Sequence, residues 1–188
     1  MKPFVMKIRL FLVGLFASLS LISCKNSEEK AQDSTIAQET KPTNAFRVTL
    51  TAIIPNDDSF QLYYNQDGYE APYKEENSIW KEMKGNTTPQ DIVFDLPEDV
   101  IPSYLRLDFG TNENQKEVTI RNIKIEYLNK KFEARDGQFF NYFIPNESIK
   151  STDKVTGKVV LGKKPDNSYD PLFYSEKALY DEIQKLLK

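Results

Sequence analysis

The chain has 188 residues, with one cysteine, one tryptophan and no histidine. Its 25 Lys and Arg residues stand against 28 Asp and Glu residues, a net charge of −3, and this acidic balance argues against a nucleic-acid partner, whose phosphates require a basic surface. The lack of histidine excludes Ser-His-Asp and Cys-His catalysis and histidine-bearing zinc sites. Hydrolysis by a carboxylate pair and calcium binding through oxygen ligands remain open.

The first 24 residues have the pattern of a secretory signal. Three basic residues precede an apolar run from Leu10 to about Leu21, which is shorter than the roughly 20 residues that a transmembrane helix needs. The run ends in the sequence Leu-Ile-Ser-Cys at residues 21–24, which resembles the lipobox of bacterial lipoproteins. The resemblance implies that residues 1–23 are removed and that the thiol of Cys24 is acylated. No second cysteine or histidine offers that thiol a disulfide or catalytic partner.

Acyl chains on Cys24 would hold the protein on a membrane, so we expect a lipid-anchored protein of the bacterial cell envelope, in the outer membrane, on a face that the sequence leaves undecided. Removing residues 1–23 takes away three basic and no acidic residues, which leaves 22 basic against 28 acidic residues and a net charge of −6. Residues 24–44 are polar and lack aromatic residues, which is typical of a flexible tether. Glu28 and Glu29 resemble a lipoprotein sorting signal, although an ordinary solvated linker explains them equally well.

Alternating apolar residues predict several strands in the next segment. The pattern covers residues 46–54, 60–64, 91–96 and 104–109, and the polar residues 55–59 indicate a turn between the first two strands.

The longest predicted strand covers residues 117–128 and changes its apolar parity partway along. Val118 and Ile120 share one parity, whereas Ile123 and Ile125 share the other. A β-bulge at residues 121–122 would return all four side chains to one face. Residues 128–131 then indicate a tight turn that completes a hairpin.

The pattern is weaker after residue 134. Residues 138–144 are apolar on both parities, which favours a strand or segment covered on both sides; residues 145–154 resemble a loop, and residues 158–161 a short strand. A helix over about 175–187 is predicted with Ser175 as its cap and with an apolar face; this face contains Leu179, Ile183, Leu186 and Leu187. We therefore predict an all-β fold, an antiparallel, jelly-roll-like β-sandwich over residues 45–188 with a short C-terminal helix.

Five short motifs lie between residues 61 and 125: QLYY (61–64), WKE (80–82), FDLP (94–97), LRLDFG (105–110) and VTIRNIKI (118–125). This series resembles the jelly-roll or carbohydrate-binding-module-like domains of bacterial envelope and polysaccharide-handling proteins, over about residues 46–127. The resemblance implies glycan binding and often a structural calcium, but the chain contains no calcium-loop signature.

Aromatic and polar residues are interleaved between residues 62 and 80, as the stacking faces and hydroxyl groups of sugars require. The candidate ligand-binding aromatics are Tyr63, Tyr69, Tyr73 and Trp80. A core position is the alternative for these side chains, and it is the interpretation we favour for Tyr64. Arg106 and Asp108 are further candidates; they form either an outward pair facing a ligand or, as we favour, a structural ion pair.

The sequence therefore predicts a non-catalytic protein with no cofactor and no metal site, although residues 56–58 and 65–68 offer oxygen atoms to a structural calcium. The leading hypothesis is a lipoprotein that displays a binding domain for polysaccharide. The alternative is a structural or assembly subunit that docks onto another envelope protein, and a small glycan hydrolase comes third. Burial of Trp80 in the core would remove the best residue of the leading hypothesis.

Overall fold

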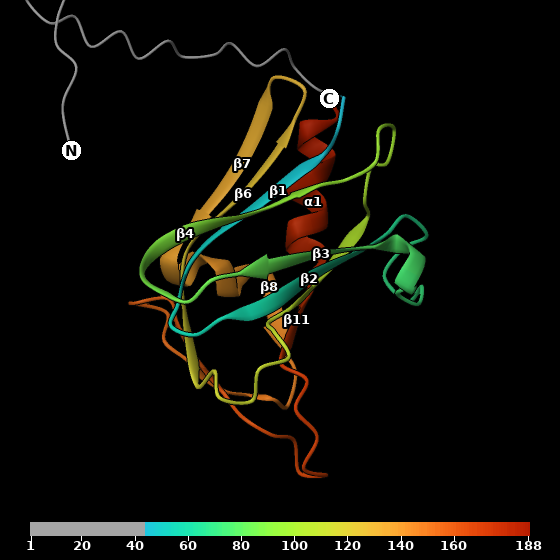
Figure 1. The fold of residues 1–188 in the computed structure, drawn as a ribbon. Coiled ribbons are helices and arrows are strands. Elements are labelled where there is room, and N and C mark those ends of the chain that lie inside the picture. Colours follow the sequence, from blue (N-terminus) through green and yellow to red (C-terminus); the bar gives the residue numbers. More distant parts are fainter. Residues whose placement is uncertain (1–43) are drawn as a thin grey trace, which may run out of the picture. The chain divides into compact units, whose positions relative to one another are not determined.

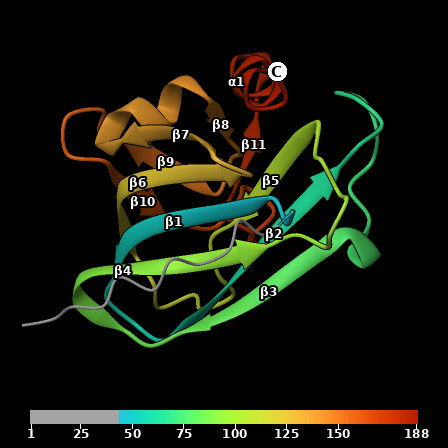
Figure 2. The same ribbon diagram turned by 90° about the horizontal axis from the view of Figure 1, so that it is seen from above.

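The computed structural model describes residues 44–188, so the predicted signal peptide, Cys24 and the predicted tether lie outside the described residues, except for its last residue, Asn44. Two antiparallel sheets face each other (Figures 1 and 2). In spatial order the first sheet contains β4 (Asn86–Asp95), β1 (Arg47–Ile54), β6 (Glu117–Tyr127), β10 (Lys158–Leu161) and β9 (Ile149–Thr152), with β7 (Lys130–Arg135) also paired to β6. The second contains β3 (Ser78–Met83), β2 (Asp58–Asn65), β5 (Tyr104–Asp108), β11 (Leu172–Ser175) and β8 (Phe143–Pro145). The predicted all-β sandwich with a short C-terminal helix is confirmed.

The alternating apolar side chains meet between the two sheets. In β1 the residues Val48, Leu50, Ala52 and Ile54 are fully buried, and in β5 Leu105 and Leu107 are fully buried as well. Large aromatic rings fill the remaining space, and seven of them are fully buried: Phe46, Phe60, Phe94, Phe109, Phe139, Phe143 and Phe173. Because one face of each strand is used in this core, the intervening side chains of each sheet point outward.

The parity change in β6 is a β-bulge, as predicted. Thr51 of β1 pairs with Asn122, whereas its neighbour Ala52 pairs with Ile120, so Arg121 is the inserted residue. Ile120 and Ile123 are both fully buried as a result. The hairpin from β6 to β7 is also confirmed, with Tyr127 paired to Lys130 across a two-residue turn.

Two predictions after residue 134 were wrong. Residues 138–144 are mainly helical, since the 3-10 helix η2 (Asp136–Asn141) precedes the short strand β8. Its tight turn sends Phe139 into the core beneath Phe143, with ring centroids 4.4 Å apart, which accounts for apolar residues on both parities. The segment 145–154 contains strand β9 rather than a continuous loop, because Ile149 anchors it against β10.

The C-terminal helix α1 (Lys177–Leu186) packs against β7 and β11. Its buried residues are Leu179, Ile183 and Leu186, whereas Leu187 is exposed and does not share their face. Ser175 does not cap it, because its Oγ accepts a hydrogen bond from the Leu105 N–H at 2.8 Å and so ties β11 to β5. No helix among residues 44–188 has both the length and the apolar character needed to cross a membrane.

Candidate functional site

The outer face of the five-stranded sheet carries two rows of side chains that cross the strands. Antiparallel pairing aligns Trp80 with Gln61, Gln61 with Asp108, and Asp108 with Leu172. Two residues along, the pairing aligns Ser78, Tyr63, Arg106, Tyr174 and Ile144 in the same way. Since residues two apart share a face of a strand, both rows point to the same side of the sheet.

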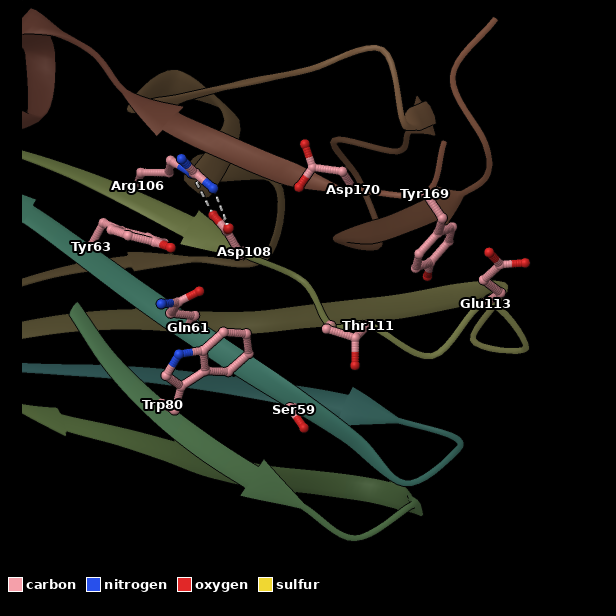
Figure 3. Close-up of a pocket in the computed structure, with 11 residues that line it drawn as sticks. Ser59, Gln61, Tyr63, Trp80, Arg106, Asp108, Thr111, Glu113, Tyr169 and Asp170 are labelled. Atoms are coloured by element: carbon pink, nitrogen blue, oxygen red, sulfur yellow. Dashed lines mark hydrogen bonds and ion pairs between the residues drawn. The ribbon is translucent and has the colours of Figure 1, made fainter. Parts of the chain in front are cut away.

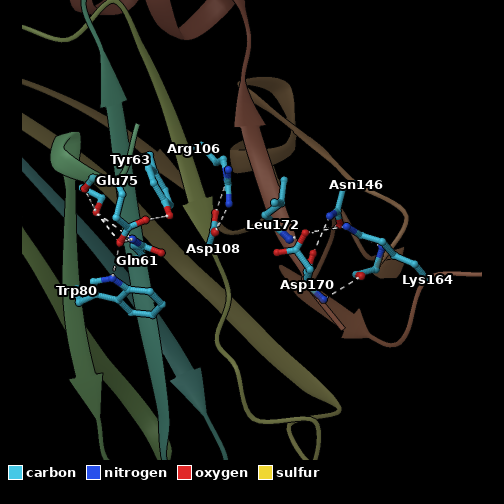
Figure 4. Close-up of polar contacts among 12 residues, drawn as sticks. Gln61, Tyr63, Glu75, Trp80, Arg106, Asp108, Asn146, Lys164, Asp170 and Leu172 are labelled. Atoms are coloured by element: carbon cyan, nitrogen blue, oxygen red, sulfur yellow. Dashed lines mark hydrogen bonds and ion pairs between the residues drawn. The ribbon is translucent and has the colours of Figure 1, made fainter. Parts of the chain in front are cut away.

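Glu75 organises one side of this face. It lies in the 3-10 helix η1 (Glu75–Asn77), immediately before β3. Its carboxylate accepts hydrogen bonds from the Tyr63 hydroxyl at 2.5 Å, the Gln61 Nε2 at 3.0 Å and the Trp80 Nε1 at 3.2 Å, as Figure 4 shows. These contacts fix the edge of the indole, while Trp80 as a whole remains 47% exposed.

The contacts with Glu75 shift the pKa values of two groups in opposite directions. The hydrogen bond from Tyr63, followed by that from Trp80, holds the pKa of Glu75 below its usual range. Burial, reinforced by the hydrogen bond to Glu75, raises the pKa of Tyr63 to about 12. At neutral pH the phenol is therefore a donor and the carboxylate an acceptor.

Arg106 and Asp108 form an outward-facing ion pair with two parallel hydrogen bonds. Arg106 Nε lies 2.7 Å from Asp108 Oδ1, and Nη2 lies 2.5 Å from Oδ2. The guanidinium also lies 4.4 Å from the centre of the Tyr63 ring, within range of a cation–π interaction. Burial raises the pKa of Asp108 even though the guanidinium opposes that shift.

A pocket of about 300 Å³ opens beside these groups (Figure 3). Trp80 lies on one side of it and Tyr169 and Asp170 on the other, with Gln61 and Asp108 between them. Asp170 is held by an ion pair of 2.7 Å with Lys164, and its backbone carbonyl accepts a hydrogen bond from Asn146. The pocket thus combines a stacking surface with several hydrogen-bonding groups.

A second pocket of about 310 Å³ lies on the same face and has an aromatic lining. Its walls include Tyr69, Tyr73, Ile144 and Tyr174. The Tyr73 ring lies 6.0 Å from that of Tyr174 and 6.4 Å from that of Tyr63, measured between centroids. Because Tyr63 also lines the first pocket, Tyr73 and Tyr63 join the two pockets.

All six residues predicted from the sequence as ligand-binding residues line one of these two pockets. The first pocket contains Tyr63, Trp80, Arg106 and Asp108, and the second contains Tyr69 and Tyr73. Their accessibility differs: Tyr69 is 60% exposed, whereas Tyr63 is 9% exposed. The ion pair expected for Arg106 and Asp108 is present, and both side chains also line the pocket.

Sequence reasoning missed several residues of this face, and four of them carry polar or aromatic contacts: Gln61, Glu75, Asp170 and Tyr174. Gln61 shares the outward parity of Tyr63, so the alternation of β2 was a usable signal for it. The other three had no such signal. Glu75 and Asp170 lie in segments without periodicity, and Tyr174 belongs to a four-residue strand that was not predicted.

In the first of the two turns considered for calcium, residues 56–58, both carboxylates have structural partners. Asp57 binds Lys84 at 2.6 Å and the Gly85 N–H at 2.8 Å. Asp58 Oδ1 accepts hydrogen bonds from the N–H groups of Thr111 and Asn112. Among residues 44–188 the structure contains no cluster of three or more His, Cys, Asp or Glu residues suited to a metal ion.

No protein-family model, curated protein or solved structure gives a significant match to this chain.

Proposed function

We propose that this chain is a membrane-anchored, non-catalytic lipoprotein of the bacterial envelope that binds polysaccharide on the outer face of its five-stranded sheet. The single observation that carries the proposal is the half-exposed indole of Trp80, held at its edge by Glu75 and set beside a pocket lined with polar groups. An aromatic face stacks on the C–H face of a sugar, and neighbouring carboxylate and amide groups bind its hydroxyl groups.

Trp80 is the only tryptophan of the chain, so tryptophan fluorescence reports on this site alone. We would titrate the detergent-solubilised full chain with neutral and acidic oligosaccharides and follow emission, with calorimetry as a second readout. A ligand should shift the emission, and Trp80→Ala should weaken binding by at least tenfold, about 1.4 kcal/mol. Trp80→Phe should retain part of the affinity.

Leu128→Ala is a matched control, because Leu128 is also a large exposed apolar side chain but lies in the turn between β6 and β7. This variant should bind like the unmodified chain. The proposal is wrong if no oligosaccharide binds, or if both alanine variants bind equally well.

The anchoring half of the proposal rests on the lipobox-like sequence that ends at Cys24. Expression in a Gram-negative host with an alkyne-tagged fatty acid should label the chain and place it in the membrane fraction. Cys24→Ser should lose the label and release the protein from membranes. Labelling that persists in Cys24→Ser would contradict this assignment.

The apolar second pocket favours one alternative, a subunit that docks onto another envelope protein through Tyr69, Ile144 and Tyr174. Such a subunit would co-purify with a defined partner and lose it in Tyr69→Ala, without binding oligosaccharides. The same oligosaccharides distinguish a hydrolase from a non-catalytic binding protein. A hydrolase would release reducing ends from them and would lose that activity in Asp108→Asn.

A further inference from the structure

The two pockets together span the width of the five-stranded sheet. Trp80 lies on β3 and Tyr174 on β11, with β2 and β5 between them. Three steps of about 4.8 Å between neighbouring strands separate β3 from β11 by about 14 Å. A single sugar ring cannot contact both side chains, whereas a chain of sugars laid across the strands contacts both.

The side chains between these two ends contact one another in series. Tyr63 is covered on one side by the Arg106 guanidinium, and its ring also contacts Tyr73, which leans toward Tyr174. Tyr73 is itself held in place, because its hydroxyl donates a hydrogen bond to the Leu105 carbonyl at 3.0 Å. The bridge between the pockets is therefore fixed before any ligand arrives, which lowers the entropic cost of binding.

The charges along this surface disfavour an acidic ligand. The one cation that lines the first pocket, Arg106, already binds a carboxylate, that of Asp108. Beside the pocket, Lys164 binds Asp170, and Lys163 binds Glu113 at 2.8 Å. Glu75 adds a fourth carboxylate, so four negative groups stand against three positive ones. No side chain lining the second pocket is charged. An anionic sugar would therefore meet repulsion, with no unpaired cation in the lining of either pocket to offset it.

The same carboxylates suit hydroxyl groups. An ionised carboxylate only accepts hydrogen bonds and offers about four lone-pair positions. Asp170 uses Oδ2 for its ion pair with Lys164, which leaves Oδ1 as an acceptor at the pocket. Neutral sugars supply donors for such acceptors along their whole length.

Resting on the proposed function, we infer that the ligand is an uncharged glycan chain that crosses the sheet from Trp80 to Tyr174 and occupies both pockets. Trp80 provides the first contact, available to short and long ligands alike. The pocket of Tyr69 and Tyr174 provides a second contact that only a longer chain reaches.

The test compares chain lengths in two chemical classes. The full chain in detergent is first screened against an array of neutral and acidic glycans, from disaccharides to hexasaccharides. The best neutral series and an oligogalacturonate series of the same lengths are then titrated. We expect neutral hexasaccharide to bind about tenfold more tightly than neutral disaccharide, and the acidic series to bind more weakly at every length.

Variants of Trp80 and Tyr174 should then show how much each of the two contacts contributes to binding. Tyr174→Ala should remove the tenfold gain of the hexasaccharide over the disaccharide, whereas Tyr174→Phe should keep most of the gain. Trp80→Ala should weaken both lengths. Tyr174 is 37% exposed, so its truncation should not unfold the chain, and Tyr69→Ala gives an independent change in the same pocket.

The possible outcomes distinguish this inference from the proposed function. Trp80-dependent binding that is equal for disaccharide and hexasaccharide would overturn the inference and leave the proposed function standing. A preference for oligogalacturonate would overturn the assignment of an uncharged ligand. Failure of every glycan on the array to bind would remove both.

Discussion

The outer faces of the two sheets are both polar, but they are built from different side chains. On the six-stranded sheet, pairing aligns Asp95, Arg47, Glu126 and Lys131 in one row, and acidic and basic groups alternate along it. On the five-stranded sheet, the corresponding rows contain Trp80, Tyr63 and Tyr174 beside Gln61, Arg106 and Asp108. The same alternation of side chains along the strands therefore gives the six-stranded sheet a charged, solvated outer face. It gives the five-stranded sheet an outer face with aromatic side chains and two pockets.

The connections above each sheet explain much of the difference. The segment between β2 and β3 folds over the outer face of the five-stranded sheet and brings Glu75 into contact with Gln61, Tyr63 and Trp80. It also brings Tyr73 against Tyr63. This segment partly buries ionisable groups on the outer face of the five-stranded sheet. We therefore expect the loss of one partner of an ion pair to cost more stability on this face than on the outer face of the six-stranded sheet.

The largest expected effect is a loss of stability caused by a substitution at Gly110, next to the first pocket. Gly110 lies two residues after the end of β5 and has a φ of 89°, and a Cβ there would clash with the Asp58 carboxylate. Asp58 cannot move aside, because its Oδ1 accepts backbone hydrogen bonds from Thr111 and Asn112. Gly110→Ala should therefore lower the free energy of unfolding by about 3 kcal/mol or more, measured by chemical denaturation.

Gly68→Ala is the matched control for that change. Gly68 also has a positive φ, of 103°, but its Cβ would meet nothing within 4 Å. The free energy of unfolding of this variant should fall by only about 1 kcal/mol, the cost of placing a side chain at a positive φ. Equal losses in the two variants would show that the contact with Asp58 is unimportant.

A second prediction compares one ion pair on each face. The side chains of Arg106 and Asp108 are 21% and 14% exposed, whereas those of Arg47 and Asp95 are 40% and 46% exposed. Asp108→Ala leaves a partly buried guanidinium without its partner and should cost about 2 kcal/mol of unfolding free energy. Asp95→Ala should cost about 0.5 kcal/mol.

Denaturation of both variants at low and high salt sharpens this comparison. Added salt should reduce the small effect of Asp95→Ala and leave that of Asp108→Ala nearly unchanged, because screening acts mainly on exposed charges. If Asp108→Ala and Asp95→Ala lower the free energy of unfolding equally, the ion pairs of the two outer faces do not differ in stability and the prediction is wrong.

A third effect, smaller than those of Gly110→Ala and Asp108→Ala, concerns the hydrogen bond from Tyr63 to Glu75. The pKa of Tyr63 is raised to about 12 from its ordinary value of 10.0, so the folded state holds the phenolic proton more tightly than the unfolded state. The stability that this proton confers is complete below pH 10 and is lost as pH rises through about 12. Tyr63→Phe should cost about 1 kcal/mol at neutral pH, and less above pH 11.

Denaturation curves of Tyr63→Phe and the unmodified chain, recorded from neutral pH to pH 12, test this directly. The quantity of interest is the difference between the two chains, since the pKa values of Tyr73 and Tyr169 are also raised by burial. A difference that grows with pH would contradict the assigned sign.

Sequence reasoning was most successful where alternation was strong and strands were long. It identified β1, the core position of Tyr64 and the bulge in β6, because each depends on a period of two that burial enforces. It missed β3, β9 and β11. β9 and β11 have four residues each and β3 is an edge strand whose side chains are only partly buried, so their patterns were weak.

The candidate site divides in the same way. The aromatic residues were visible as a cluster in the sequence, and the outward parity of Arg106 and Asp108 followed from Leu105 and Leu107. The contribution of Asp170 was not visible, because it lies 62 positions after Asp108 and reaches the pocket through the segment that leads into β11.

The sequence by itself determined which side chains point to one side of each strand, since successive residues of a strand alternate between its faces. It also determined the composition of the candidate ligand surface and the single cysteine at the end of the signal-like segment. Only the tertiary structure decided which strands become neighbours, and therefore that Trp80, Asp108 and Tyr174 share one face. That choice depends on how two sheets bury their apolar sides together, which is a property of the whole core and of no local segment.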